Sequence, residues 1–201
     1  VVIGGGSFRM SGNEREDGLL KIVNCVKLKS ITLDSGSFED YESIELNNLS
    51  TLESLVFGSN CFRHASSLSM NGLNGLRSIQ FGSSSFAETE SLVISNNSLS
   101  VLDDVTVSSG SLNALHSLTI GSNSLNSISS FPFSSFSDLT TLTIGSSSLN
   151  SLEQLSLINL LNIQSITIHP MTLTNVHELV LGGMSRLSSF TIGANSLTSV
   201  E

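Results

Sequence analysis

The residues best suited to chemistry are few and scattered along the 201-residue chain. The four histidines are His64, His116, His169 and His177. None of them stands in an HxH or HxxxH spacing that would place two ligands on one metal ion. We expect them at surface or corner positions. No set of nucleophile, base and orienting group emerges, so the sequence predicts no catalytic residue, no cofactor and no metal site, and the protein is predicted not to be an enzyme.

The two cysteines, Cys25 and Cys61, fall at different points of the repeat described below. Cys25 shares a column with Leu49 and Leu73, which predicts an apolar core residue. A Cys25–Cys61 disulfide is the less favoured alternative, and two thiols neither establish nor exclude secretion.

Oxygen ligands and modification motifs form the remaining candidates. The segment DSGSFEDYESIEL gathers the carboxylates of Asp34, Glu39, Asp40, Glu42 and Glu45. Ca²⁺ binds clustered oxygens, but neither EF-hand nor nonapeptide calcium-repeat spacing is present, so a solvated acidic face is favoured. The GGG at positions 4–6 is followed by no phosphate-binding pattern.

Two Asn-x-Ser sequons make Asn48 and Asn96 candidate glycosylation sites if the protein is secreted.

Composition excludes several classes of partner. The net charge is −9 with a pI near 4.7, which argues against nucleic acid and against anionic membrane surfaces. Only 12% of the residues are charged and the mean hydropathy is +0.24, so Ser, Thr and Asn must supply the polar surface. One Tyr and no Trp leave few aromatic platforms for bases or sugars. No run of about 18 apolar residues predicts a transmembrane helix.

One short phrase recurs along the chain: LTIGSNSL at 118–125, LTIGSSSL at 142–149 and FTIGANSL at 190–197. Triplets of the form apolar–x–apolar recur at steps that alternate between 13 and 11. They begin at Ile31, Ile44, Leu55, Leu68 and Ile79, and again at Leu118, Phe131, Leu142, Leu155, Ile166, Leu179 and Phe190. A fixed period of about 24 residues with two half-steps is typical of a solenoid.

The triplets predict strands, because alternate residues of a strand face opposite sides and because Ile, Val, Thr and Phe favour pleated surfaces. The sequence therefore predicts an all-β, right-handed solenoid over residues 1–201 with two parallel sheets, whose strands stack about 4.8 Å apart. The predicted core residues include Ile31, Leu33, Leu55, Phe57, Ile79, Phe81, Leu142, Ile144, Ile166 and Ile168.

The corner after each phrase strand has two predicted features. Its glycine is expected to give the backbone the freedom to turn, at Gly58, Gly82, Gly121, Gly145 and Gly193. Its last apolar residue is expected to re-enter the core, at Phe38, Phe62, Phe86, Leu125, Leu149 and Leu197.

Three irregularities interrupt the period. The charged stretch SGNEREDG predicts a loop inserted near residues 9–18. Three successive steps of 13 from Ile79 to Leu118 require that the phrase change sides of the coil or that one half-step be looped out. Pro132 donates no ladder hydrogen bond, so a local break in one sheet is expected there.

The segments LTTLTIGSSSLNSL (139–152), LESLVFGSNCF and LRSIQFGSSSF fit the leucine-rich-repeat pattern LxxLxLxxNxL, with Ser147 where Asn is preferred. The chain resembles the BspA-like leucine-rich repeats of bacterial and protist surface proteins over nearly all of its length. The half of the turn opposite the phrase departs from the usual pattern, because LEQLSLINL predicts a second strand where a helix or irregular segment is common. The resemblance implies adhesion or recognition at a cell surface and carries no catalytic residues.

Small hydroxyl side chains recur at the outward strand positions. One predicted column contains Thr32, Thr106, Thr119, Thr143, Thr167 and Thr191, interrupted by Val56 and Gln80. A flat hydroxyl array of this kind resembles the surface of ice-binding solenoids. We favour the simpler interpretation that these are ordinary exposed strand residues, because the neighbouring column is mostly Ser and this one is interrupted.

The sequence thus predicts a non-enzymatic extracellular or cell-surface repeat protein for adhesion, recognition or fibre assembly, with an ice-binding solenoid as the alternative. The expected partners are proteins or further copies of the chain stacked end to end, with no nucleic acid and no membrane insertion. Both ends of the sequence are repeat phrase without a polar cap, so the chain is interpreted as a segment of a longer array.

Overall fold

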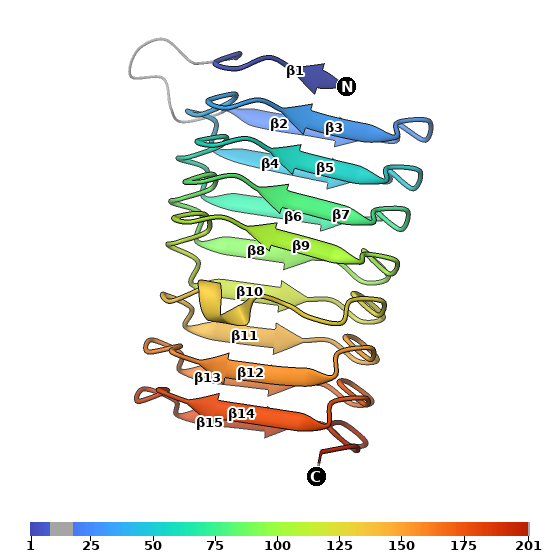
Figure 1. Cartoon of the computed structure of the whole chain (residues 1–201), viewed down its shortest axis with the longest axis vertical. Coiled ribbons are helices and arrows are strands. Elements are labelled where there is room, and N and C mark those ends of the chain that lie inside the picture. The colour runs from blue at the N-terminus through green and yellow to red at the C-terminus, as the bar shows by residue number, and fades with distance from the viewer. Residues whose placement is uncertain (9–17, 201) are drawn as a thin grey trace.

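The structure is a computed structural model that describes residues 1–8 and 18–200. The described chain forms an all-β solenoid, and Figure 1 shows a coil with the two termini at opposite ends of its long axis. The strands of successive turns pair in parallel, for example Leu55 with Ile79 and Leu142 with Ile166. The predicted fold class is confirmed. The predicted loop near 9–18 falls almost wholly on residues outside the described ranges.

The strands form two broad faces. Sheet A contains β1 (Val2–Ile3), β3 (Ser30–Leu33), β5 (Ser54–Phe57), β7 (Ser78–Phe81) and β9 (Asp104–Val107). Sheet B lies behind it and contains β2 (Leu19–Val23), β4 (Ser43–Asn47), β6 (Ser67–Asn71), β8 (Ser91–Ile94), β10 (Ser117–Ile120), β11 (Thr141–Ile144), β13 (Ser165–Ile168) and β15 (Ser189–Ile192). Sheet C contains β12 (Gln154–Ile158) and β14 (Glu178–Gly182) and continues the side of sheet A (Figure 1). The segment LEQLSLINL therefore does contain the second strand that the sequence predicted.

The core is one continuous column of apolar side chains between the two faces. All ten predicted core residues are buried, with at most 2% of their surface exposed. The alternation holds along each strand: Leu142 and Ile144 of β11 point inward, whereas Thr141 and Thr143 are partly exposed. Burial on one side of each strand fixes its register, because a slip of one residue would expose every apolar side chain.

In the corner after each phrase strand, the chain turns at two residues with a left-handed backbone, and one residue separates them. After β10 they are Asn123 (φ 55°) and Leu125 (φ 56°), and after β11 they are Ser147 (φ 58°) and Leu149 (φ 55°). A left-handed leucine costs about 1–3 kcal/mol, and full burial of the side chain offsets a similar amount. The predicted re-entry into the core is confirmed for Phe38, Phe62, Phe86, Leu125 and Leu149, and Leu197 is partly buried.

The corner glycines are required for a different reason from the one predicted. None of Gly58, Gly82, Gly121, Gly145 and Gly193 has a positive φ. A Cβ at Gly145 would instead lie 2.5 Å from the backbone nitrogen of Ser122, and one at Gly82 would lie 2.6 Å from the backbone of Gly58 and Ser59. These glycines are needed because the backbones of successive turns approach too closely for any side chain.

A column of buried hydroxyls ties the corners together. The Ser148 hydroxyl donates to the carbonyl of Gly121 at 2.7 Å and accepts the backbone N–H of Ser124 at 3.1 Å. Ser124 and Thr172 occupy the same position one turn away and donate in the same way to the carbonyls of Ser95 and Gly145. These hydroxyls thereby satisfy backbone groups that the end of a strand leaves without partners.

The phrase changes sides in the middle of the coil, which is the first of the two outcomes expected from the steps of 13. It follows β7 of sheet A at Phe81 and Gly82, and it follows β10 of sheet B at Ile120 and Gly121. The turns at the switch are longer than the others by two residues, as the pairing of Ser78 with Asp104 and of Ser91 with Ser117 shows.

The sheet on the front side breaks where Pro132 predicted a break. Between β10 and β11 the chain crosses the front as an irregular segment with the 3₁₀ helix η1 (Phe133–Ser135), and β9 and β12 stand apart on either side of it (Figure 1). The triplet Phe131–Phe133 is therefore not a strand, although Phe133 is still buried.

Gly145→Ala is expected to destabilise the protein by about 1–3 kcal/mol, because the added methyl group must push two turns apart. Gly4→Ala is the control, since a Cβ there meets nothing within 4 Å and its φ is not positive. Urea denaturation followed by circular dichroism measures both. Equal stability of the two variants would contradict the close-approach explanation.

Candidate binding surface

The outward side chains of the last four strands of sheet B form a continuous field of hydroxyl groups. We call it the hydroxyl face; it consists of Ser117, Thr119, Thr141, Thr143, Ser165, Thr167, Ser189 and Thr191. The register is maintained from turn to turn, because Thr119 pairs with Thr143, Thr143 with Thr167 and Thr167 with Thr191. Within the described part of the chain, none of these eight hydroxyls donates a hydrogen bond to another protein group.

The predicted threonine column is divided between two faces of the molecule. Thr32 and Thr106 lie on sheet A, in one column with Val56 and Gln80. Thr119, Thr143, Thr167 and Thr191 lie on sheet B. The prediction of a single column is wrong because the phrase changes sides between β7 and β10. The residues that interrupted the predicted column, Val56 and Gln80, are consequently absent from the hydroxyl face.

The hydroxyl face is also free of charge. Residues 105–200 contain only four Asp, Glu, Lys or Arg side chains, namely Asp138, Glu153, Glu178 and Arg186, and none of them is an outward residue of these four strands of sheet B. The column of Thr119 changes character toward the N-terminus, where Lys21 of β2 lies 2.6 Å from Glu45 of β4. Between Glu45 and Thr119 lie Ser69 of β6 and Val93 of β8, so the uncharged surface of sheet B extends from β6 to β15, and the unbroken hydroxyl array begins at β10.

Charges in the N-terminal half stack with alternating sign. Lys29, Glu53, Arg77 and Asp103 follow one another at the starts of β3, β5, β7 and β9. Lys29 lies 2.5 Å from Glu53, and Arg77 lies 3.5 Å from Asp103. The hydrogen bond from Lys29, with the positive charges of Lys29 and Arg77, lowers the pKa of the exposed Glu53 carboxyl.

The histidines and the carboxylates of the predicted acidic segment lie at exposed or partly exposed positions. His116, His169 and His177 are exposed, and His64 is half-buried with its Nδ1 2.9 Å from Glu88 Oε1. Glu45 of the predicted acidic segment pairs with Lys21. Within residues 1–8 and 18–200, no three His, Cys, Asp or Glu side chains come close enough to hold a metal ion.

The two cysteines are free thiols in contrasting environments. Cys25 is exposed, so its prediction as a core residue is wrong. It follows β2, the outermost described strand of sheet B, and no described turn covers it there, whereas Leu49 and Leu73 lie between neighbouring turns. Cys61 is buried and occupies the corner position that Ser37 and Ser85 fill, with its thiol 3.2 Å from the carbonyl of Asp34.

The two sequon asparagines lie at exposed corners. Asn48 has a left-handed backbone (φ 53°) and donates to the Asn24 side chain, whereas Asn96 accepts the backbone N–H of Ser122. Ser98, the third residue of the second sequon, is buried and accepts the backbone N–H of Gly72. Neither asparagine side chain is buried, so glycosylation at both positions stays a prediction.

Comparison with known families matches residues 109–201 to the BspA type leucine-rich repeat region, in six copies. The resemblance predicted from the sequence is thereby confirmed over residues 109–201, which match that repeat. Comparison with curated proteins and with solved structures gives no match. Among the described residues, no helix is long and apolar enough to cross a membrane.

Cys61 is expected to make stability depend on alkaline pH. Burial raises the pKa of its thiol, so the folded protein keeps the proton at pH values where an unfolded cysteine, with a pKa of about 8.5, has lost it. The contribution of the protonated thiol to the free energy of unfolding is complete below about pH 8.5, and it is lost as the pH rises through the pKa of the folded protein. Denaturation between pH 7 and pH 10 should show this loss, and Cys61→Ser should flatten it while keeping the fold. An equal pH dependence in both proteins would contradict the prediction.

Proposed function

We propose that the protein is a non-enzymatic recognition solenoid of the cell surface or extracellular space, and that it binds protein partners through the hydroxyl face. The observation that carries this proposal is a wide, regular, uncharged surface whose eight hydroxyls donate to no other group of the described chain. The BspA-type repeats of residues 109–201 support it, because that family suggests surface or protein interaction.

A partner can cover the hydroxyl face at a low cost in free energy, and this is the physical argument for binding there. Burying a charged group against a partner requires a matching charge, whereas a hydroxyl requires only one hydrogen bond. The side chains are short, so little conformational entropy is lost when they are immobilised. A parallel sheet held in register from β10 to β15 is also preorganised, which reduces the cost of association. The partner that fits best is a flat protein surface with uncharged hydrogen-bonding groups.

The extracellular location is part of the proposal. Two exposed sequon asparagines, Asn48 and Asn96, are compatible with passage through a secretory pathway. Charge is sparse, and the C-terminal half relies on Ser, Thr and Asn for its polar surface. Mass spectrometry of protein secreted from eukaryotic cells, with and without glycosidase, determines whether these asparagines carry glycans.

Thr143→Lys combined with Thr167→Lys is expected to reduce binding at least ten-fold, because it places two charges in the centre of the hydroxyl face. The matched control is Gln80→Lys with Thr106→Lys, on the equivalent column of adjacent strands in sheet A. Labelled protein binding to intact cells, and sedimentation velocity for self-binding, measure the effect. Absence of any binding by the unmodified chain, or an equal loss in the sheet A variant, would contradict the proposal.

Ice binding is the second candidate, favoured by one specific observation. The S-x-T or T-x-T pattern occurs on four consecutive strands of sheet B, without the interruptions that the sequence suggested. Strand pairing spaces these residues about 4.8 Å apart across the sheet, and residues i and i+2 lie about 6.6 Å apart along a strand.

Thr143→Tyr with Thr167→Tyr would disrupt the flatness of this array. If the unmodified protein shows thermal hysteresis in freezing solutions, these substitutions should abolish it, whereas Gln80→Tyr with Thr106→Tyr should not. An intact protein without thermal hysteresis would exclude ice as the ligand.

We also propose that copies of the chain associate end to end, through the apolar end of the coil rather than through the hydroxyl face. Ile192 and Leu181 of the last described turn are 47% and 41% exposed, whereas Ile168 and Leu157, one turn earlier, are fully buried. Another repeat, or the first turn of another copy, would cover this apolar surface and pair with the outer edges of β14 and β15, beside which no further strand lies among the described residues. A chain that remains monomeric at high concentration in sedimentation would contradict association between copies.

A further inference from the structure

The tripeptide Asn-Gly-Leu occurs twice in succession, at residues 71–73 and 74–76. These are the two Asn-Gly pairs of the chain, and each follows an apolar residue, so their local sequences are nearly the same. Asn-Gly is the dipeptide most prone to spontaneous deamidation, because glycine has no side chain to shield its backbone nitrogen from the asparagine amide. Any difference in reactivity between the two pairs must therefore come from the fold.

Deamidation begins when the glycine nitrogen, having lost its proton, attacks Cγ of the asparagine. The bond between this nitrogen and Cγ forms, the bond between Cγ and Nδ2 breaks, and ammonia leaves with the proton, so a succinimide ring remains. Water then adds to one of the two ring carbonyls and opens the ring, which gives aspartate or isoaspartate. The reaction is fastest when the glycine N–H and the asparagine amide are both free of hydrogen bonds.

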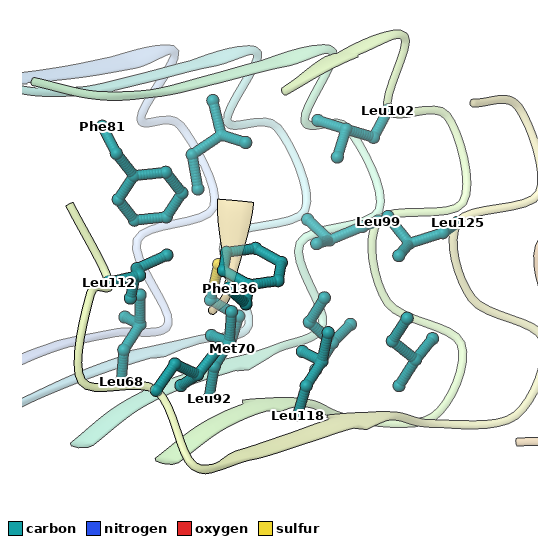
Figure 2. Close-up of a cluster of buried hydrophobic side chains, with 14 of the residues drawn as sticks. Leu68, Met70, Phe81, Leu92, Leu99, Leu102, Leu112, Leu118, Leu125 and Phe136 are labelled. Atoms are coloured by element: carbon teal, nitrogen blue, oxygen red, sulfur yellow. The ribbon is translucent and has the colours of Figure 1, made fainter. Parts of the chain in front are cut away.

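The first pair is held by the fold at both reacting groups. The side-chain amide of Asn71, the last residue of β6, donates to Oδ1 of Asn47 at 3.2 Å. The N–H of Gly72 donates to the Ser98 hydroxyl at 2.9 Å. Pairing of Asn71 with Asn47 in sheet B fixes the backbone as well. Met70 anchors the strand just before this point, since it lies in the buried apolar cluster of Figure 2.

The second pair lies in an exposed corner and is not held in this way. Asn74 is exposed in the corner between β6 and β7. A hydrogen bond from the N–H of Leu76 to the carbonyl of Leu73 closes this corner and does not involve the N–H of Gly75. Within residues 1–8 and 18–200, neither the side-chain amide of Asn74 nor the N–H of Gly75 makes a hydrogen bond. Both reacting groups are therefore accessible to each other and to water.

We propose that Asn74 is a modification site, at which the folded protein deamidates spontaneously while Asn71 stays intact. The co-reactant is water, and the products are ammonia and an aspartyl or isoaspartyl residue at position 74. The site lies outside the hydroxyl face, which begins at β10, so it does not rest on the proposed function.

Isoaspartate formation has a structural consequence, because it lengthens the main chain of this corner by one carbon. The corner has no room for that carbon: Leu73 and Leu76 on either side of the pair are fully buried, and the backbone at Gly75 passes directly against the carbonyl of Ser50. The longer chain displaces a leucine from the core or separates two turns. The isoaspartyl form should therefore have a lower melting temperature than the unmodified protein.

Proteolysis and tandem mass spectrometry after incubation of the intact chain at mildly alkaline pH measure both positions in one sample. In the folded protein, Asn74 is expected to convert about ten-fold faster than Asn71 or more, because two hydrogen bonds must break before Asn71 reacts. In urea the two should convert at similar rates. Incubation in H₂¹⁸O should label each product, as hydrolysis of a succinimide requires. Equal rates in the folded protein, or Asn74 unreacted when the urea-unfolded chain is fully converted, would overturn the proposal.

Two variants separate the effect of the fold from that of the sequence. Asn74→Gln should abolish conversion at this position, because the longer side chain closes its ring far more slowly. Ser98→Ala removes the acceptor of the Gly72 N–H and should accelerate conversion of Asn71 several-fold, with Asn74 unchanged. An unchanged rate at Asn71 in a folded Ser98→Ala variant would overturn the explanation by hydrogen bonding. If that variant does not fold, the ratio of the two rates in the unmodified chain decides the question.

Discussion

The backbones of successive turns touch at the corner after each phrase strand, and the rest of the fold depends on this contact. Strand pairing sets the spacing of the turns at about 4.8 Å, so the corner has no room to move away. Gly145 therefore passes directly against Gly121 and Ser122. Ser148 then bonds the two turns through its hydroxyl, and Leu149 enters the core from a left-handed backbone. Gly145, Ser148 and Leu149 of the phrase GSSSL thus each have a physical cause in this one corner.

The sequence was sufficient for the features that repeat within one turn. Alternation along a strand depends only on residues i and i+2, so the burial of Leu142 and Ile144 could be read directly from the order of residues. The features that it did not predict depend on neighbours one turn away. The role of the corner glycines requires knowledge of the backbone of the preceding turn, and the exposure of Cys25 reflects the lack of a described turn above β2. To predict that the threonine column divides between two sheets, one must know on which side of the coil each half-step lies.

The switch of the phrase from sheet A to sheet B determines which side of the coil carries the hydroxyl face. Before the switch, the outward residues of the phrase strands lie on sheet A and include Val56 and Gln80; after it, they lie on sheet B and are threonines. Two extra residues between β8 and β9, which belong to both of the overlapping longer turns, are the sequence change associated with this shift. In the described chain, the front has no strand around Pro132, between β9 and β12.

Parallel in-register stacking limits which charges a face can carry. Identical positions of neighbouring turns lie about 4.8 Å apart, so a column of like charges would repel itself. The N-terminal half meets this limit by alternating sign, as Lys29, Glu53 and Arg77 show. The C-terminal half meets it by omitting charge from the hydroxyl face. Stacking alone accounts for threonine there, since threonine favours strands, but serine is not among the residues enriched in strands. The serines at Ser117, Ser165 and Ser189 stand at the first position of their strands, as Ser30, Ser54 and Ser78 do on sheet A, so serine at this position belongs to the repeat on both faces.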